Sequence, residues 1–152
     1  MAASSLSTSA GIIKTDLVYD PARWQTTSSG QQDLPGATIN LLVGGSASPS
    51  WGAIFVATFS AETLVQATGN NGVLGLDILF NGQQSHPVSG NHRFDNANDQ
   101  GEWSSRTTTR VFEVPAQMTQ STFTAKVVVD PSATITTAGL QNWVLRIDRY
   151  SV

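Results

Sequence analysis

The residues that most suggest chemistry surround a polar loop that ends at a tryptophan. The loop contributes carboxylate and amide groups from Asp95, Asn98 and Asp99, and Trp103 is followed three positions later by Arg106. A sugar site combines an apolar ring platform with planar hydrogen-bonding groups. These five residues therefore predict a shallow carbohydrate-binding site. The alternative role for Trp103 is packing in the core or in a subunit interface.

The same loop is rich in the oxygen ligands that calcium prefers. An EF-hand loop begun at Asp95 would have Ala97 at its third position and Gln100 where glycine is needed. The alternative is a solvated loop whose Asn and Asp side chains cap its own backbone. Zinc binding by His86 and His92 would need a third ligand from elsewhere in the chain or from a symmetry mate. The alternative is that both histidines are plain turn residues. We expect no cofactor, with calcium as the alternative.

The composition argues against several classes of function. Charged residues make up 12% of the 152 positions, and the net charge is -3. Lys and Arg form no cluster, whereas a nucleic-acid-binding protein needs a basic stripe. No apolar run reaches the length of a membrane span, so we expect no membrane insertion. There is no cysteine, and we find no nucleophile elbow or Gly-rich phosphate loop, so we expect a protein that is not an enzyme.

The elements that must position any site are predicted to be β-strands. Gly, Pro and Asn recur at the spacing typical of a sandwich or barrel, and Ser and Thr together occupy 34 positions. No stretch has a convincing helical period. We predict strands at Ile12–Tyr19, Arg23–Thr27, Ala37–Val43, Trp51–Ala61, Val73–Phe80, Gln83–His86, Arg106–Val114, Thr122–Val129 and Asn142–Tyr150.

The strand predicted at Trp51–Ala61 is apolar on both faces where it begins. Alternation puts Trp51, Phe55 and Phe59 on one face and Ile54 and Val56 on the other. Such a strand is central in its sheet, or one of its faces meets another subunit. A weakly charged surface also lowers the repulsion between subunits. The predicted oligomer interface consists of Trp51, Phe55, Phe59 and Tyr150.

The order of several short motifs resembles that of a known family. LPG at Leu34–Gly36 precedes an apolar strand, FSAE follows at Phe59–Glu62, Asn-Gly stands at 81–82 before Pro87, and the chain closes with LQNWVLRIDRYSV. Over residues 33–152 this order resembles bacterial and phage jelly-roll domains of the tumour-necrosis-factor-like, or complement globular-head, type. The resemblance implies a ten-stranded sandwich that trimerises around an axis of aromatic and aliphatic side chains. It implies no catalytic residues, because the family shares no active site.

Together these observations predict an all-β antiparallel sandwich, a trimeric jelly roll, with an N-terminal arm over residues 1–30 and the jelly-roll domain over residues 31–152. The arm is expected to lie along a neighbouring subunit or a host surface. The function expected is that of a non-catalytic assembly protein that decorates a larger particle, a phage virion, as a capsid decoration or fibre component. Its location would then be the virion or an extracellular surface, and its partners a capsid or other particle surface protein. The alternative is a lectin-like head that binds glycans.

Overall fold

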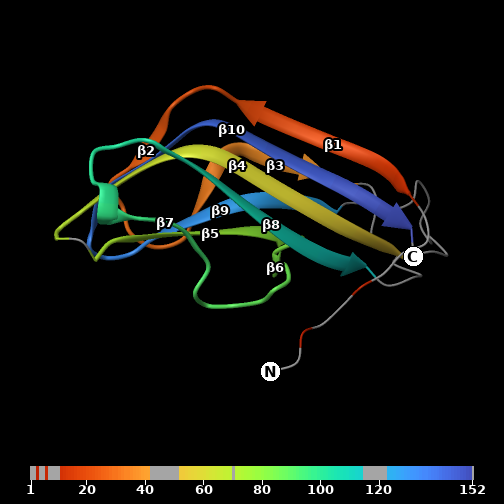
Figure 1. Ribbon diagram of the computed structural model, residues 1–152. Helices are drawn as coiled ribbons and strands as arrows, with labels where there is room; N and C mark the ends of the chain where they lie inside the picture. The colour runs from red at the N-terminus through yellow and green to blue at the C-terminus, as the bar shows by residue number, and fades with distance from the viewer. Residues whose placement is uncertain are drawn as a thin grey trace.

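The computed structural model is a sandwich of two five-stranded sheets, and all of their strand pairings are antiparallel (Figure 1). It describes Ala3, Leu6 and residues 11–41, 52–69, 71–114 and 123–151. Sheet A has the order β1-β10-β4-β8, with β2 paired to β10, and sheet B has the order β3-β9-β5-β6, with β7 paired to β5. The predicted all-β antiparallel sandwich is confirmed at this level, and its ten strands are consistent with a jelly roll.

The strands have the following bounds. Sheet A contains β1 (Ile12–Asp20), β2 (Trp24–Thr26), β4 (Ala53–Ala67), β8 (Ser104–Val114) and β10 (Ile135–Ser151). Sheet B contains β3 (Gln32–Asn40), β5 (Val73–Phe80), β6 (Gln83–Gln84), β7 (Arg93–Asn96) and β9 (Thr124–Pro131), and one 3-10 turn, η1 (Ala97–Asp99), follows β7. Among the described residues no helix is long and apolar enough to cross a membrane.

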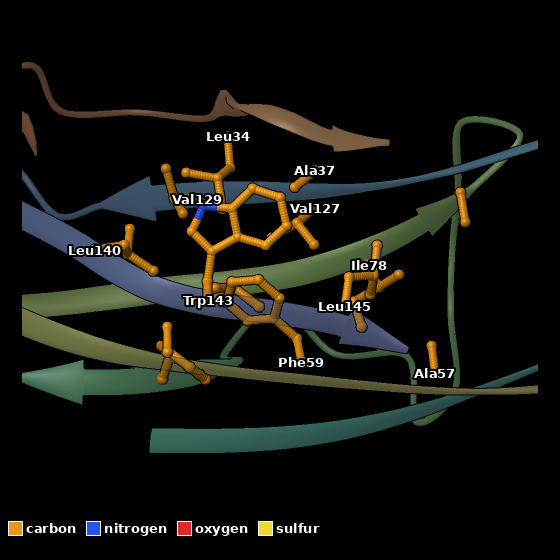
Figure 2. Packing of buried hydrophobic residues seen from close by; sticks show 14 of the residues in the cluster. Leu34, Ala37, Ala57, Phe59, Ile78, Val127, Val129, Leu140, Trp143 and Leu145 are labelled. Atoms are coloured by element: carbon orange, nitrogen blue, oxygen red, sulfur yellow. The ribbon is translucent and has the colours of Figure 1, made fainter. Parts of the chain in front are cut away.

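The core lies between the two sheets and is built by period-two alternation. Along β10 the buried residues Trp143, Leu145 and Ile147 alternate with outward side chains. Figure 2 shows the Trp143 ring among side chains of both sheets, including Leu34 and Phe59. The ring centroids of Trp143 and Phe59 are 6.1 Å apart. Trp143 is therefore a core residue, as the alternation of the last strand predicts.

The predicted boundary of the N-terminal arm needs correction. β1 and β2 fall inside the range 1–30, yet both are strands of sheet A that pair with β10. The inward side chain of Val18 packs against the core. The sandwich therefore begins no later than Ile12. An arm before that point lies outside the described residues, apart from Ala3 and Leu6.

Candidate functional site

Asp95, the first residue of the predicted sugar site, is a buried structural carboxylate. It lies in β7 and is 7% exposed. It accepts hydrogen bonds from the hydroxyl of Thr63 on β4 and from the backbone amide of Asn96. Arg106 on β8 donates to it from Nε at 3.1 Å and lies 3.0 Å away through Nη2. Its oxygens are already occupied, so Asp95 and Arg106 hold β7 against sheet A instead of facing a ligand.

Trp103 is also engaged with its own chain. Its half-buried ring carries the Arg23 guanidinium 4.7 Å from its centroid, a cation–π contact. The edge of the ring lies over Gly139 of β10, where an added Cβ would come within 3.0 Å of it. Arg23 also donates from Nε to the side-chain oxygen of Gln141 at 3.0 Å. Arg23 therefore covers one face of the indole. This contact argues against the prediction that the Trp103 ring is an open platform for a sugar.

Asn98 and Asp99 lie in η1, separate from Trp103. The turn begins at Asn96, whose side-chain oxygen accepts a hydrogen bond from the Asn98 amide at 3.0 Å. This is the self-capping that sequence composition offers as an alternative to a calcium site. The side chain of Asp99 lies outside the described part of the structure. Of the five predicted sugar-site residues, the structure brings together Asp95 and Arg106 as an ion pair and places Asn98 at the rim of a depression.

This depression lies beside the predicted site. It is shallow, with a volume of about 300 Å³, and Asn71, Arg93, Asn96 and Asn98 line it together with Gly72 and Val73. The lining offers three amides and one guanidinium, planar groups that suit sugar hydroxyls or a carboxylate. Arg93 and Asn71 were missed by the sequence prediction. The sequence offers only their positions as a clue to this role. Asn71 precedes Gly72 in a loop, and Arg93 lies two residues before Asp95.

Gly72 fixes the floor of this depression. A Cβ at Gly72 would lie 2.5 Å from the Cβ of Ala67 and 2.7 Å from Cδ1 of Ile135. The Ile135 side chain could turn away, but the Cβ of Ala67 is fixed by the backbone, so the contact at 2.5 Å cannot be relieved without moving a strand. Only glycine therefore lets the loop before β5 pass between the end of β4 and the start of β10, with its carbonyl accepting from the Ala97 amide of η1 at 3.0 Å.

A second buried carboxylate, Asp77 on β5, organises the segment between β6 and β7. It is 8% exposed. His92 places Nδ1 3.4 Å from its Oδ2, and Arg110 places Nε 3.6 Å from its Oδ1. Ser85 donates to the Ile78 carbonyl at 2.7 Å. This cluster, defined as Asp77, Ser85, His92 and Arg110, was not predicted, because its members come from three separate segments of the chain.

The Asp77 cluster contains Ser, His and Asp but is not arranged as a catalytic triad. Nε2 of His92 lies 2.7 Å from the Pro87 carbonyl, which can only accept, so Nε2 carries a proton and does not serve Ser85 as a base. The Ser85 hydroxyl is buried and donates to a backbone carbonyl. Within the described residues no three His, Cys, Asp or Glu side chains gather as a metal site. The geometry is that of a structural cluster.

The predicted interface residues divide between core and surface. Phe55 and Phe59 are 0% exposed and contact other rings of the core. They cannot form a contact between subunits, and that part of the prediction is wrong, because β4 is central and directs them between the sheets. Tyr150 follows the outward positions of β10 and is half-buried, so it remains a surface candidate. Trp51 lies outside the described residues.

Comparisons with known proteins found distant structural likenesses. No family model and no curated protein matches the chain. It is similar to the VP2 protein of infectious bursal disease virus, at 12% identity and a TM-score of 0.43, over 97% of this chain and 36% of that one. It is similar to the Bacillus thuringiensis delta-endotoxin Cry8Ea1 at 16% identity and a TM-score of 0.37, over 86% of this chain and 19% of that one.

A third similar structure is the CBM22-1 xylan-binding domain of Paenibacillus barcinonensis Xyn10C. The identity is 8% and the TM-score 0.34, over 93% of this chain and 97% of that domain. At such identities and TM-scores the likeness assigns no family to this chain. It leaves the function open.

Proposed function

We propose that the chain is a non-catalytic assembly protein: a jelly roll of the tumour-necrosis-factor-like type that forms a homotrimer and decorates a larger particle, a phage virion. It would be located on the virion or on an extracellular surface, with a capsid or other particle surface protein as its partner. The observation that supports this proposal is the outward face of sheet A.

The middle rows of this outward face are weakly polar, and the carboxylates of Glu62 and Glu113 stand in its end rows. Val144 is 39% exposed on β10, and Tyr150 lies on the same side of that strand. The two charges between them on this strand, Arg146 and Asp148, are paired at 3.1 Å. Neighbouring strands continue the face with Val56, Thr58, Ser60, Thr107, Thr109 and Val111, which occupy matching rows of the ladder.

Such a face costs little to bury against another subunit. Hydroxyl groups can pair across an interface, and an ion pair that is already formed brings no unpaired charge into it. Apolar and aromatic side chains are enriched at the centres of interfaces. We therefore assign the threefold contact to this face, with Tyr150 kept from the original interface prediction and with Val144 and Val56 in place of Phe55 and Phe59.

Val144→Lys is expected to abolish the threefold contact. It would place an unpaired ammonium group at the centre of an apolar contact, while Val144 is exposed enough for the single chain to fold. The solution mass is measured by light scattering on a sizing column. The wild type should have the mass of three copies or a multiple of three, and the mass of the variant should no longer be a multiple of three copies. Thr38→Lys, on an exposed position of sheet B, is the matched control. A wild-type mass of one or two copies would rule the trimer out.

A second candidate function, a carbohydrate-binding head, is favoured by the depression lined by Arg93, Asn71 and Asn98. Its guanidinium group suits acidic glycans. On a glycan array the wild type should bind acidic sugars, and Arg93→Ala should lose at least tenfold in signal. Lys126→Ala, which removes an exposed cation from sheet B, is the control. Trp103→Ala should bind normally because Trp103 does not line the depression. An array without signal at high protein concentration would speak against this function.

A further inference from the structure

β1 is an edge strand of sheet A, and none of the described strands pairs with its outer edge. Its inner edge pairs with β10 (Figure 1). The register with β10 shifts between Ile12 and Lys14, and Pro21 follows the strand. Between these two interruptions the segment Lys14–Asp20 runs as seven regular residues.

Exposed strand edges usually carry a device that prevents pairing with another chain, such as a proline, a bulge, inward-pointing charged residues or a covering segment. The edge strand of sheet B has such a device, because β3 contains Pro35 and its register with β9 shifts between Asp33 and Thr38. The other edge of sheet A is bridged in part, since His86 pairs with Val111 of β8. The segment Lys14–Asp20 has no proline and no bulge.

The side chains on β1 are unusually apolar for an open edge. Leu17 is 57% exposed and Tyr19 is 72% exposed, and both lie on the outward face of sheet A opposite Arg146 and Val144 of β10. The charges of the segment, which are Lys14, Asp16 and Asp20, lie on the inward side, and Lys14 Nζ is 3.3 Å from Asp16 Oδ1 of its own strand. Such inward charges oppose pairing unless the partner strand sets opposite charges against them. An edge of this kind favours a partner strand with the same alternation.

We propose that β1 pairs antiparallel with β1 of a second copy across a two-fold axis at Leu17. In this register Leu17 faces the same residue of the second copy, and Tyr19 faces Thr15. On the inward side Lys14 faces Asp20, and the symmetry repeats that ion pair at the other end of the segment. The two sheets A become one continuous sheet, as in strand addition at a sheet edge.

Charge complementarity selects this register over its neighbours. The outward faces of the two copies remain on the same side of the joined sheet only in registers that differ by steps of two. Each such step shifts the residue opposite a given position by two along the partner strand. One neighbouring register sets Asp16 against Asp16, and the other sets Asp16 against Asp20 twice. Like charges directly opposite each other destabilise a strand pair. A further step in the first direction would set Lys14 against Asp16 but would draw the bulge at Ile12–Lys14 into the contact, where it disrupts the ladder.

This contact is separate from the proposed threefold contact. The threefold contact uses the outward face of sheet A, and the two-fold contact uses the hydrogen-bonding edge of β1. If the two-fold axis crosses the threefold axis at a right angle, the two contacts together close into an assembly of six copies. A single pairing of two short strands is weak, and three such contacts between two trimers strengthen one another.

Charge reversal tests the proposal, with the solution mass as the readout. Six copies of the 16.1 kDa chain have a mass of about 97 kDa, and three have about 48 kDa. Lys14→Asp and Asp20→Lys each set like charges opposite each other and are expected to halve the wild-type mass. The double variant, Lys14→Asp with Asp20→Lys, exchanges the partners and is expected to restore it. If the threefold contact does not exist, the same halving and rescue occur between two copies and one, so the two proposals fail separately.

Three controls separate a loss of the two-fold contact from general effects of charge or misfolding. Lys126→Asp removes an exposed ion pair with Asp33 on sheet B and should leave the mass unchanged. Asp20 also accepts a hydrogen bond from the Ala22 amide at 2.8 Å, so Asp20→Asn keeps that acceptor and removes only the charge. Circular dichroism confirms that each variant is folded.

Two results would overturn the proposal. One is a mass that stays at the wild-type value in both single variants, or a wild-type mass of one copy at every concentration. The other is rescue by Lys14→Asp with Asp16→Lys in place of the Asp20 exchange, which would contradict the register centred on Leu17.

Discussion

Asp77→Asn is expected to lower the free energy of unfolding by about 3–5 kcal/mol. The substitution preserves the shape of the side chain but removes the charge that faces Arg110 and His92 in a buried setting. The Arg110 guanidinium, only 10% exposed, would be left without a counter-charge. Removing one partner of a buried ion pair is costly because the other charge stays desolvated.

Urea unfolding followed by circular dichroism measures this loss. The matched control is Asp33→Asn, the same chemical change in the exposed pair with Lys126, which should cost no more than about 1 kcal/mol. Adding Arg110→Met to Asp77→Asn should recover part of the stability, because no buried charge is then left unpaired. Equal losses for Asp77→Asn and Asp33→Asn would show that the Asp77 cluster does not support the fold.

The Asp77 cluster also shows why the buried ion pairs could not be predicted from the sequence. Its four residues lie on β5, on the segment between β6 and β7, and on β8, and they meet only because the two sheets face each other at this edge. A sequence records that Asp77 follows an apolar residue in a strand, but it does not record which cation will reach it. The same holds for Asp95, whose partners Thr63 and Arg106 belong to other strands. A buried carboxylate and a ligand-binding carboxylate therefore look alike in sequence.

The strands with regular alternation were predictable. The bounds predicted for Val73–Phe80 agree with β5, and Asn81-Gly82 forms the expected tight turn, with φ of 52° and 81°. β7 was missed because Phe94 is its only apolar residue, and the polar side chains around it indicate a loop. Leu34-Pro35-Gly36 was expected to separate strands, yet it lies inside β3. There the ladder with β9 is interrupted and Gly36 adopts φ of 82°.

β10 began earlier than expected for a related reason. Its predicted start at Asn142 coincides with a bulge, where Asn142 has φ of 50° and the register with β4 shifts between Gln141 and Val144. The strand continues on the other side of the bulge back to Ile135. In these two strands, β3 and β10, Asn, Pro and Gly thus mark an interruption of the hydrogen-bonded ladder and not the end of the strand.

Trp143→Ala is expected to cost about 3–5 kcal/mol of the free energy of unfolding. The indole is 2% exposed and lies between the sheets beside Phe59, so its removal leaves a cavity that neither sheet can close without losing other contacts. Trp143→Phe fills part of that space and should cost less. Chemical denaturation followed by circular dichroism measures both variants.

The adjacent residue provides the control. Val144→Thr changes the outward side chain of the same strand and keeps its branched shape, and a single-chain effect within about 0.5 kcal/mol is expected. The two positions are neighbours in sequence, so a large loss at Trp143 with a small one at Val144 would reflect burial alone. Similar losses at both would mean that the outward face of sheet A is covered even in one chain. That result would remove the surface to which the threefold contact is assigned.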